Sequence, residues 1–187
     1  MRNPTRAVLA AAAVCSIAGA AYAAGTGNPH LNSDPSFTDG GTSLTATGSV
    51  FGLGSGNTGP TAITMTAMAN PTATCSNKGN NKPPGHNPAS VVITGTDTIK
   101  PSAIVTNGGT PFTVSASLSQ TTIPSDSPDF SCPSSNWTEV INDLAFTSAI
   151  ISVNGAAVAN CTFAAEFNGG TQNGAVPPGE VSCNLNP

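Results

Sequence analysis

A short polar stretch, residues 76–89, concentrates side chains that could bind a ligand. Lys78, Lys82 and His86 lie in it among Asn, Gly and Pro residues, directly after Cys75. Such groups on a long loop could bind a ligand at one end of a β-domain, where connecting loops gather. The alternative is a solvated loop in which Gly and Pro prevent strand formation, although loops of this length are often functional. We take the three ionisable side chains as candidate ligand-binding residues.

Trp137 is the only tryptophan of the chain and the second candidate for a binding site. An indole ring can anchor a partner or a sugar at the surface, or it can cap a hydrophobic core beside Cys132. We favour a core or half-core position and keep the binding role open.

The sequence lacks the patterns that hydrolytic chemistry needs. It holds no G-x-S-x-G motif, and only His30 and His86 could serve a serine nucleophile as a base. Carboxylate pairs for glycoside hydrolysis have few aromatic residues beside them to line a sugar-binding cleft. The acids available for such pairs are Asp126, Asp129, Glu139, Asp143, Glu166 and Glu180. We predict that the protein is not an enzyme and uses no cofactor.

Acidic residues in two short stretches raise the question of calcium. Asp126 and Asp129 lie in PSDSPD, and Asp34 and Asp39 lie in DPSFTD. Neither stretch matches an EF-hand loop, and acids in such loops are more often turn residues that bond their own backbone. Zinc would require a ligand spacing that the cysteines and histidines do not show. We assign no metal site and keep Asp126 and Asp129 as calcium candidates.

The first 23 residues are typical of a secretory signal peptide. Two arginines precede an alanine-rich apolar run, and Ala21-Tyr22-Ala23 provides a small-x-small cleavage signal. The run is too short for a membrane span, and Val14 before Cys15 does not suit a lipoprotein signal. We expect an exported mature chain from Ala24, with no membrane insertion after cleavage and a secreted or cell-surface location.

The mature chain would carry three lysines, no arginine and nine acids, a net charge of −6. Nucleic-acid binding and attraction to anionic lipid both need a cationic face, so we exclude these partners. Charged residues make up 7% of the chain, against about 25% in ordinary globular domains. Ser, Thr, Asn and Gly supply the polarity instead, which suits an extracellular surface.

Four cysteines remain after cleavage, and an even number in an exported chain predicts two disulfides. Three pairings are possible. We favour Cys75–Cys132, which would tie two earlier elements, and Cys161–Cys183, which flank a candidate hairpin.

Short alternating segments, rich in Thr, Val and Ile and separated by Gly, Pro and Asn, predict an all-β domain. The expected strands are 42–50, 61–75 with a bulge or edge position at Pro71, 90–97, 102–106, 111–119, 144–153, 156–167 and one within 180–185. Turns are expected at Asn107-Gly108-Gly109 and Asn154-Gly155. We predict an immunoglobulin-like antiparallel β-sandwich over residues 42–187, preceded by a loose segment, 24–41.

Several short motifs carry a family resemblance. They are GNPH at the mature start, the strand ending in TATC, the NKGNNKPPGHNPAS loop after it, and the later Cys132-Pro133. Over Asn28 to Phe146 the chain resembles a group of small secreted bacterial proteins of unknown function. The resemblance implies no activity and transfers no functional residue.

These observations favour a protein that acts by presenting a surface. We expect a structural or adhesion protein of the cell surface or extracellular matrix. Little charge on its strand edges would permit self-association by strand addition, with residues 25–39 as the donor segment. The alternative is a monomeric module that binds an extracellular glycan or protein, and a secreted hydrolase is the least favoured class.

Overall fold

The computed structural model describes residues 27–54, 59–79, 89–164 and 173–187. Regular structure there consists of β-strands and two short 3-10 helices, η1 (Pro101–Ala103) and η3 (Pro178–Glu180). One sheet contains β1 (His30–Leu31), β2 (Ser36–Asp39), β3 (Ser43–Phe51), β6 (Thr110–Ser117) and β10 (Gly174–Ala175). The other contains β4 (Thr61–Ser76), β5 (Val91–Ile99), β7 (Thr122–Ile123), β8 (Thr138–Val153), β9 (Ala156–Phe163) and β11 (Val181–Leu185). We call them the first and second sheets.

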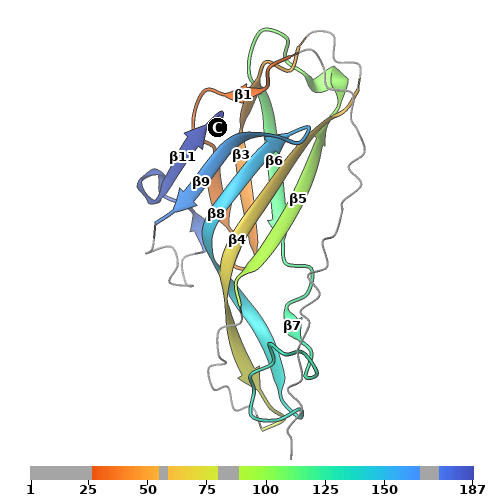
Figure 1. Cartoon of the computed structure of the whole chain (residues 1–187), viewed down its shortest axis with the longest axis vertical. Coiled ribbons are helices and arrows are strands. Elements are labelled where there is room, and N and C mark those ends of the chain that lie inside the picture. Colours follow the sequence, from red (N-terminus) through yellow and green to blue (C-terminus); the bar gives the residue numbers. More distant parts are fainter. Residues whose placement is uncertain (1–26, 55–58, 80–88, 165–172) are drawn as a thin grey trace, which may run out of the picture.

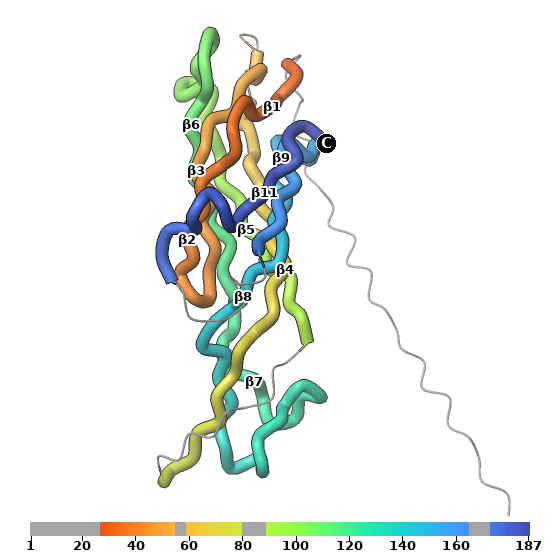
Figure 2. Tube along the Cα trace, turned by 90° about the vertical axis from the view of Figure 1, so that its left-hand side faces the viewer, coloured from red at the N-terminus to blue at the C-terminus, as the bar shows by residue number. Residues whose placement is uncertain are grey.

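All pairings between these strands are antiparallel, and Figures 1 and 2 show the sheets as two layers. The predicted all-β sandwich is therefore confirmed, while the immunoglobulin-like assignment within that class stays a prediction. The expected signal peptide, residues 1–23, lies outside the described residues. Within the described ranges, no helix is long and apolar enough to cross a membrane.

The segment before β3 belongs to the first sheet. β6 pairs with one side of β3, so β1 and β2 share the other side of β3 as two short strands, and β10 pairs along the outer side of β2. Leu31 and Phe37 are each 2% exposed, because each points its apolar side chain into the core. The prediction of a loose segment at 24–41 is thus wrong for its strand residues, which pair with β3 in this chain. The donor role of residues 25–39 stays a prediction.

The longest feature is the pair formed by β4 and β8, each of 16 residues. The pairing of β5 with β4 covers only residues 61–69 of β4. The pairing of β9 with β8 covers only residues 148–153 of β8. The two strands continue together beyond these partners as a narrow extension at the lower end of Figure 1. We call residues 70–76 of β4 with residues 138–145 of β8 the arm.

Pro71 lies in β4 between two register shifts, one at Met68/Ala69 and one at Thr72/Ala73. At each shift one β8 residue, Thr147 or Asn142, has no partner in the β4 register. Pro71 itself pairs in register with Leu144, so the bulges flank it, and it lies beyond the end of the β5 pairing at Ala69, an edge position that suits a residue with no N–H for the ladder. Bulges of this kind increase local twist, which suits a strand pair leaving a sheet.

The core lies between the sheets and is aliphatic with a small aromatic group. Ile63, Met65 and Ala67 are fully buried, as their alternation in the sequence predicts. Phe37 of the first sheet meets Phe163 of the second edge-to-face at 5.1 Å between ring centroids. These contacts join the layers across the sandwich.

The connection from β5 to β6 differs from the prediction. Residues 102–106 were expected to form a strand and a hairpin through Asn107, but Pro101–Ala103 is a 3-10 helix. β5 and β6 belong to different sheets, so the chain passes from one layer to the other instead of turning back in one. The Asn154-Gly155 turn is confirmed, with φ values of 47° and 88° that suit a tight hairpin.

Both predicted disulfides are present. Cys161 and Cys183 lie opposite each other in β9 and β11. Cys75, near the end of β4, is bonded to Cys132 in the segment before β8. Sequence separations of 22 and 57 residues give a stabilisation of about 3–4 kcal/mol for each bridge by chain entropy.

Candidate functional site

At the free end of the arm, a disulfide holds two loop segments together, one after β4 and one before β8. The Cys75–Cys132 bond fixes the segment before β8 against the end of β4. Glu139 lies close to this bond and is fully buried. Its Oε2 accepts a hydrogen bond from the Ser131 N–H at 2.7 Å, and its Oε1 accepts one from the Ser131 hydroxyl at 2.6 Å. Covalent and charge-assisted bonds therefore hold the loop that leads to Trp137.

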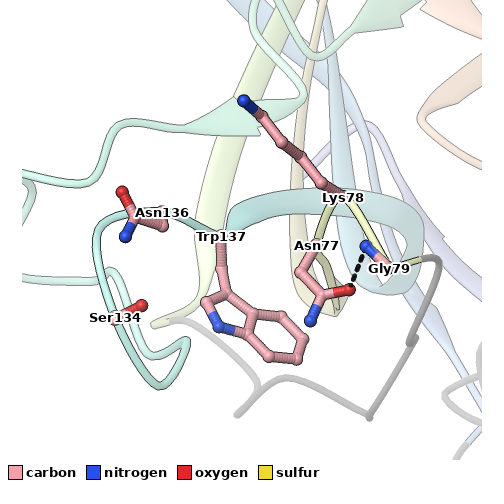
Figure 3. Close-up of a pocket in the computed structure, with 6 residues that line it drawn as sticks. All are labelled: Asn77, Lys78, Gly79, Ser134, Asn136 and Trp137. Carbon is pink, nitrogen blue, oxygen red and sulfur yellow. Dashed lines mark hydrogen bonds between the residues drawn. The ribbon is translucent and has the colours of Figure 1, made fainter.

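An open cleft of about 510 Å³ lies at this end of the molecule. Two loop segments line it, with the residues Asn77, Lys78, Gly79, Ser134, Asn136 and Trp137 (Figure 3). We call this hollow the tip cleft. Figure 3 shows the indole beside Asn77, while Lys78 points away from the ring.

Local turns place the side chains of the tip cleft. The Trp137 N–H donates to the Ser134 carbonyl at 3.0 Å, which closes a turn before β8. The Asn77 side-chain oxygen accepts the Gly79 N–H at 2.9 Å, which closes a second turn after β4. Trp137 is half-buried and borders the cleft, but it is not among the described residues packed in or against the hydrophobic core.

The chemistry of the tip cleft is that of recognition. An indole can stack on an apolar ligand face, while amide, hydroxyl and ammonium groups beside it can hydrogen-bond polar ligand atoms. None of its described lining residues carries a carboxylate. A further hollow of about 350 Å³ is lined by Thr74, Ser76, Val140 and Asn142 of the arm itself.

Comparison of this chain with protein-family models, curated proteins and solved structures gives no match. The resemblance to small secreted bacterial proteins stays a prediction.

The structure brings together two of the four predicted ligand-binding residues, Lys78 and Trp137, in the tip cleft. Lys82 and His86 lie outside the described residues. The partners Asn77, Ser134 and Asn136 were missed, although their positions close to Cys75 and Cys132 in the sequence were a usable signal. The cysteine pairing alone implied that these two loops would meet.

Asp126 and Asp129, the calcium candidates, are exposed residues of a loop. The Asp129 N–H donates to the Ser127 hydroxyl at 3.2 Å, so the side chain that bonds the backbone in this turn is that of the serine. Glu139, Cys75 and Cys132 lie close enough together for a metal, but the two sulfurs are bonded to each other. His30 hydrogen-bonds through Nδ1 to the Asn28 carbonyl at 2.8 Å and stacks on Phe51.

A second polar feature lies where the arm leaves the sandwich. Asp39 and Asp143 come from opposite sheets and are 5% and 8% exposed. Burial raises the pKa of Asp39 to about 6, with a smaller contribution from the Asp143 charge and an opposing one from the Gly41 N–H. Burial also raises the pKa of Asp143. Sequence reasoning did not pair these residues.

Proposed function

We propose that this protein is an exported adhesion protein that binds a glycan through the tip cleft at the end of its arm. The observation that carries the proposal is the position of Trp137, which is half-buried on a disulfide-held loop at the far end of the arm. A binding surface held away from the body of a domain can reach a partner across a crowded cell surface.

The composition of the tip cleft supports a glycan ligand. Sugars offer an apolar ring face together with many hydroxyl groups, and the cleft offers one indole together with amides, a hydroxyl and an ammonium group. Export is supported by two disulfides, which persist in oxidising compartments, and by the signal-peptide pattern.

The single tryptophan makes the test direct. A glycan array probed with labelled, oxidised protein would identify a ligand, and titration of that ligand should change the emission of Trp137 and protect it from acrylamide quenching. Trp137→Ala should remove binding on the array. Val105→Ala is the control, because Val105 is an apolar residue that is 46% exposed and lies outside the tip cleft.

Two results would contradict the proposal. One is binding that survives in Trp137→Ala while its thermal unfolding matches that of the parent protein. The other is the absence of any glycan or surface-protein ligand for the oxidised protein.

A structural, self-associating role is the second candidate, and one surface favours it. Met68, Val92 and Ile150 are 47%, 61% and 40% exposed. Met68 pairs directly with Val92, and Ile150 pairs with Thr66, two residues from Met68. All three lie on one sheet among uncharged neighbours. Light scattering behind size-exclusion chromatography should then show oligomers that Met68→Lys disperses, whereas a clean monomer would contradict this role.

A further inference from the structure

Two buried carboxylates face a single turn from opposite sheets. Asp39 is the last residue of β2, and Asp143 lies in β8 directly after the bulge residue Asn142. Gly41, in the turn between β2 and β3, contacts both strands. Its N–H donates to Asp39 Oδ1 at 2.7 Å, and its carbonyl accepts the Leu144 N–H at 2.8 Å. The turn therefore connects the first sheet to the base of the arm.

A third oxygen-bearing side chain reaches the same place. A Cβ atom built on Gly41 would lie 3.5 Å from Asp143 Oδ1 and 3.3 Å from the side-chain oxygen of Asn173. Asn173 directly precedes β10, which pairs with β2. Three chain segments thus place oxygen atoms around Gly41. Asn173 is itself exposed, so the group borders solvent.

No residue in the described ranges gives Asp143 Oδ1 a hydrogen-bond partner, although this atom is inaccessible to solvent and its residue is more than nine-tenths buried. A buried carboxylate oxygen without a partner is costly and calls for a counter-charge. The groups that influence the pKa of the two carboxyls are backbone N–H groups and, for Asp39, the charge of Asp143. Among the described residues, no basic side chain contributes to either pKa. The described hydrogen bonds at this turn therefore leave Asp143 Oδ1 without a partner, and a second acid, Asp39, lies at the same turn.

We infer that Asp39, Asp143 and Asn173 form a calcium site that ties the first sheet to the base of the arm. Carboxylate and amide oxygens are the ligands that Ca²⁺ takes, and its flexible coordination tolerates ligands from separate segments completed by water. A bound Ca²⁺ supplies the missing partner of Asp143 Oδ1 and neutralises both carboxylates. Extracellular calcium modules bind with dissociation constants of about 10⁻⁴–10⁻³ M, and this site belongs in that range.

The test uses the full oxidised protein stripped of metal with a chelator. Calcium titration by calorimetry should show one site, and calcium at about ten times the dissociation constant should raise the unfolding temperature by about 3–5 °C. Asp143→Asn and Asp39→Asn should each lose both the heat and the temperature shift. These variants remain informative because removing an uncompensated buried charge should not lower the stability of the metal-free protein.

The matched control is the double variant Asp126→Asn/Asp129→Asn, which removes two exposed acids and should keep the full calcium response. Three outcomes would overturn the inference. They are no heat or temperature shift at about 10 mM calcium, a response to Mg²⁺ but not to Ca²⁺, and a calcium response that survives in Asp143→Asn. The site is independent of the tip cleft, so its failure would leave the proposed adhesion role standing.

Discussion

Asn186 pairs with Leu31 as a backbone peptide would. Its side-chain oxygen accepts the Leu31 N–H at 3.1 Å, and its side-chain nitrogen donates to the Leu31 carbonyl at 3.3 Å. The Asn186 N–H also donates to the Val158 carbonyl at 2.9 Å. One residue near the end of the chain therefore links β1 of the first sheet to β9 of the second. Its φ of 55° is a conformation that asparagine adopts more readily than most residues.

Removing this amide should destabilise the fold. Asn186→Ala loses both bonds to Leu31 and replaces asparagine by a residue that tolerates positive φ less well, so we expect a loss of stability of about 1–2 kcal/mol. Asn186→Gly relieves the backbone strain and isolates the loss of the amide. Urea unfolding measures both, with Asn184→Ala on the exposed side of β11 as the control. If Asn184→Ala and Asn186→Ala lost equal stability, the pairing would have no special value.

Gly95 should tolerate no side chain. A Cβ atom there would lie 1.8 Å from the Ser115 carbonyl oxygen, so β5 and β6 can approach this closely only with glycine. Gly95→Ala should cost about 1–3 kcal/mol through overpacking. Gly179→Ala is the control, since a Cβ at Gly179 meets nothing within 4 Å. Chemical denaturation of both variants would decide, and a neutral Gly95→Ala would show that the sheets separate freely at this edge.

Glu139 should stabilise the loop of the tip cleft more than a neutral side chain can. Glu139→Ala leaves the Ser131 N–H and hydroxyl without these acceptors, and we expect a loss of about 2–3 kcal/mol. Glu139→Gln keeps one accepting oxygen and should lose less. Thermal unfolding gives the order, and the emission of Trp137 reports whether the loop has moved. Equal losses for the two variants would mean that packing, and not hydrogen bonding, explains the role of Glu139.

The metal-free protein should lose stability as the pH rises from about 4 to about 6. The folded pKa of Asp39 is about 6 and its ordinary value is 3.8, so the folded state holds the proton more tightly than the unfolded state. The contribution of this proton to the free energy of unfolding has its full value below about pH 4, and it is lost as the pH rises through the folded pKa of Asp39. The raised pKa of Asp143, the acid that faces Asp39, acts in the same direction.

Urea midpoints across this pH range in chelator would measure the effect. Asp39→Asn should flatten the profile over the same range, while Asp126→Asn should leave it unchanged. A parent profile that rises between pH 4 and 6 would contradict the assignment.

The predictable parts of this fold are those encoded by neighbouring residues. Along β4, buried residues alternate with more exposed ones, as the alternation of its sequence predicts. Residues 102–106 have strand-forming composition too, yet Pro101 starts a 3-10 helix there because the chain must pass between layers. β1 and β2 looked loose because Pro35 and polar residues interrupt them, and only pairing with β3 reveals them as strands of the first sheet.

The same distinction applies to the two sites. Lys78 and Trp137 could be connected from the sequence through the Cys75–Cys132 pairing. Asp39 and Asp143 are 104 positions apart in the numbering and meet through a turn at Gly41 beside a bulged strand. No local pattern carries that information, because it depends on how two sheets are stacked.

The arm has a mechanical consequence. A ligand pulling on the tip would load β4 and β8 along their length, and these strands continue into the middle of the second sheet between β5 and β9. Hydrogen bonds between antiparallel strands run across that direction, so tension would shear many of them at once instead of unzipping them in turn. The Cys161–Cys183 bond also fastens β9 to β11, so the outer strand β11 cannot peel away from β9. We therefore expect the fold to withstand a larger force when it is pulled along the arm than when it is pulled sideways.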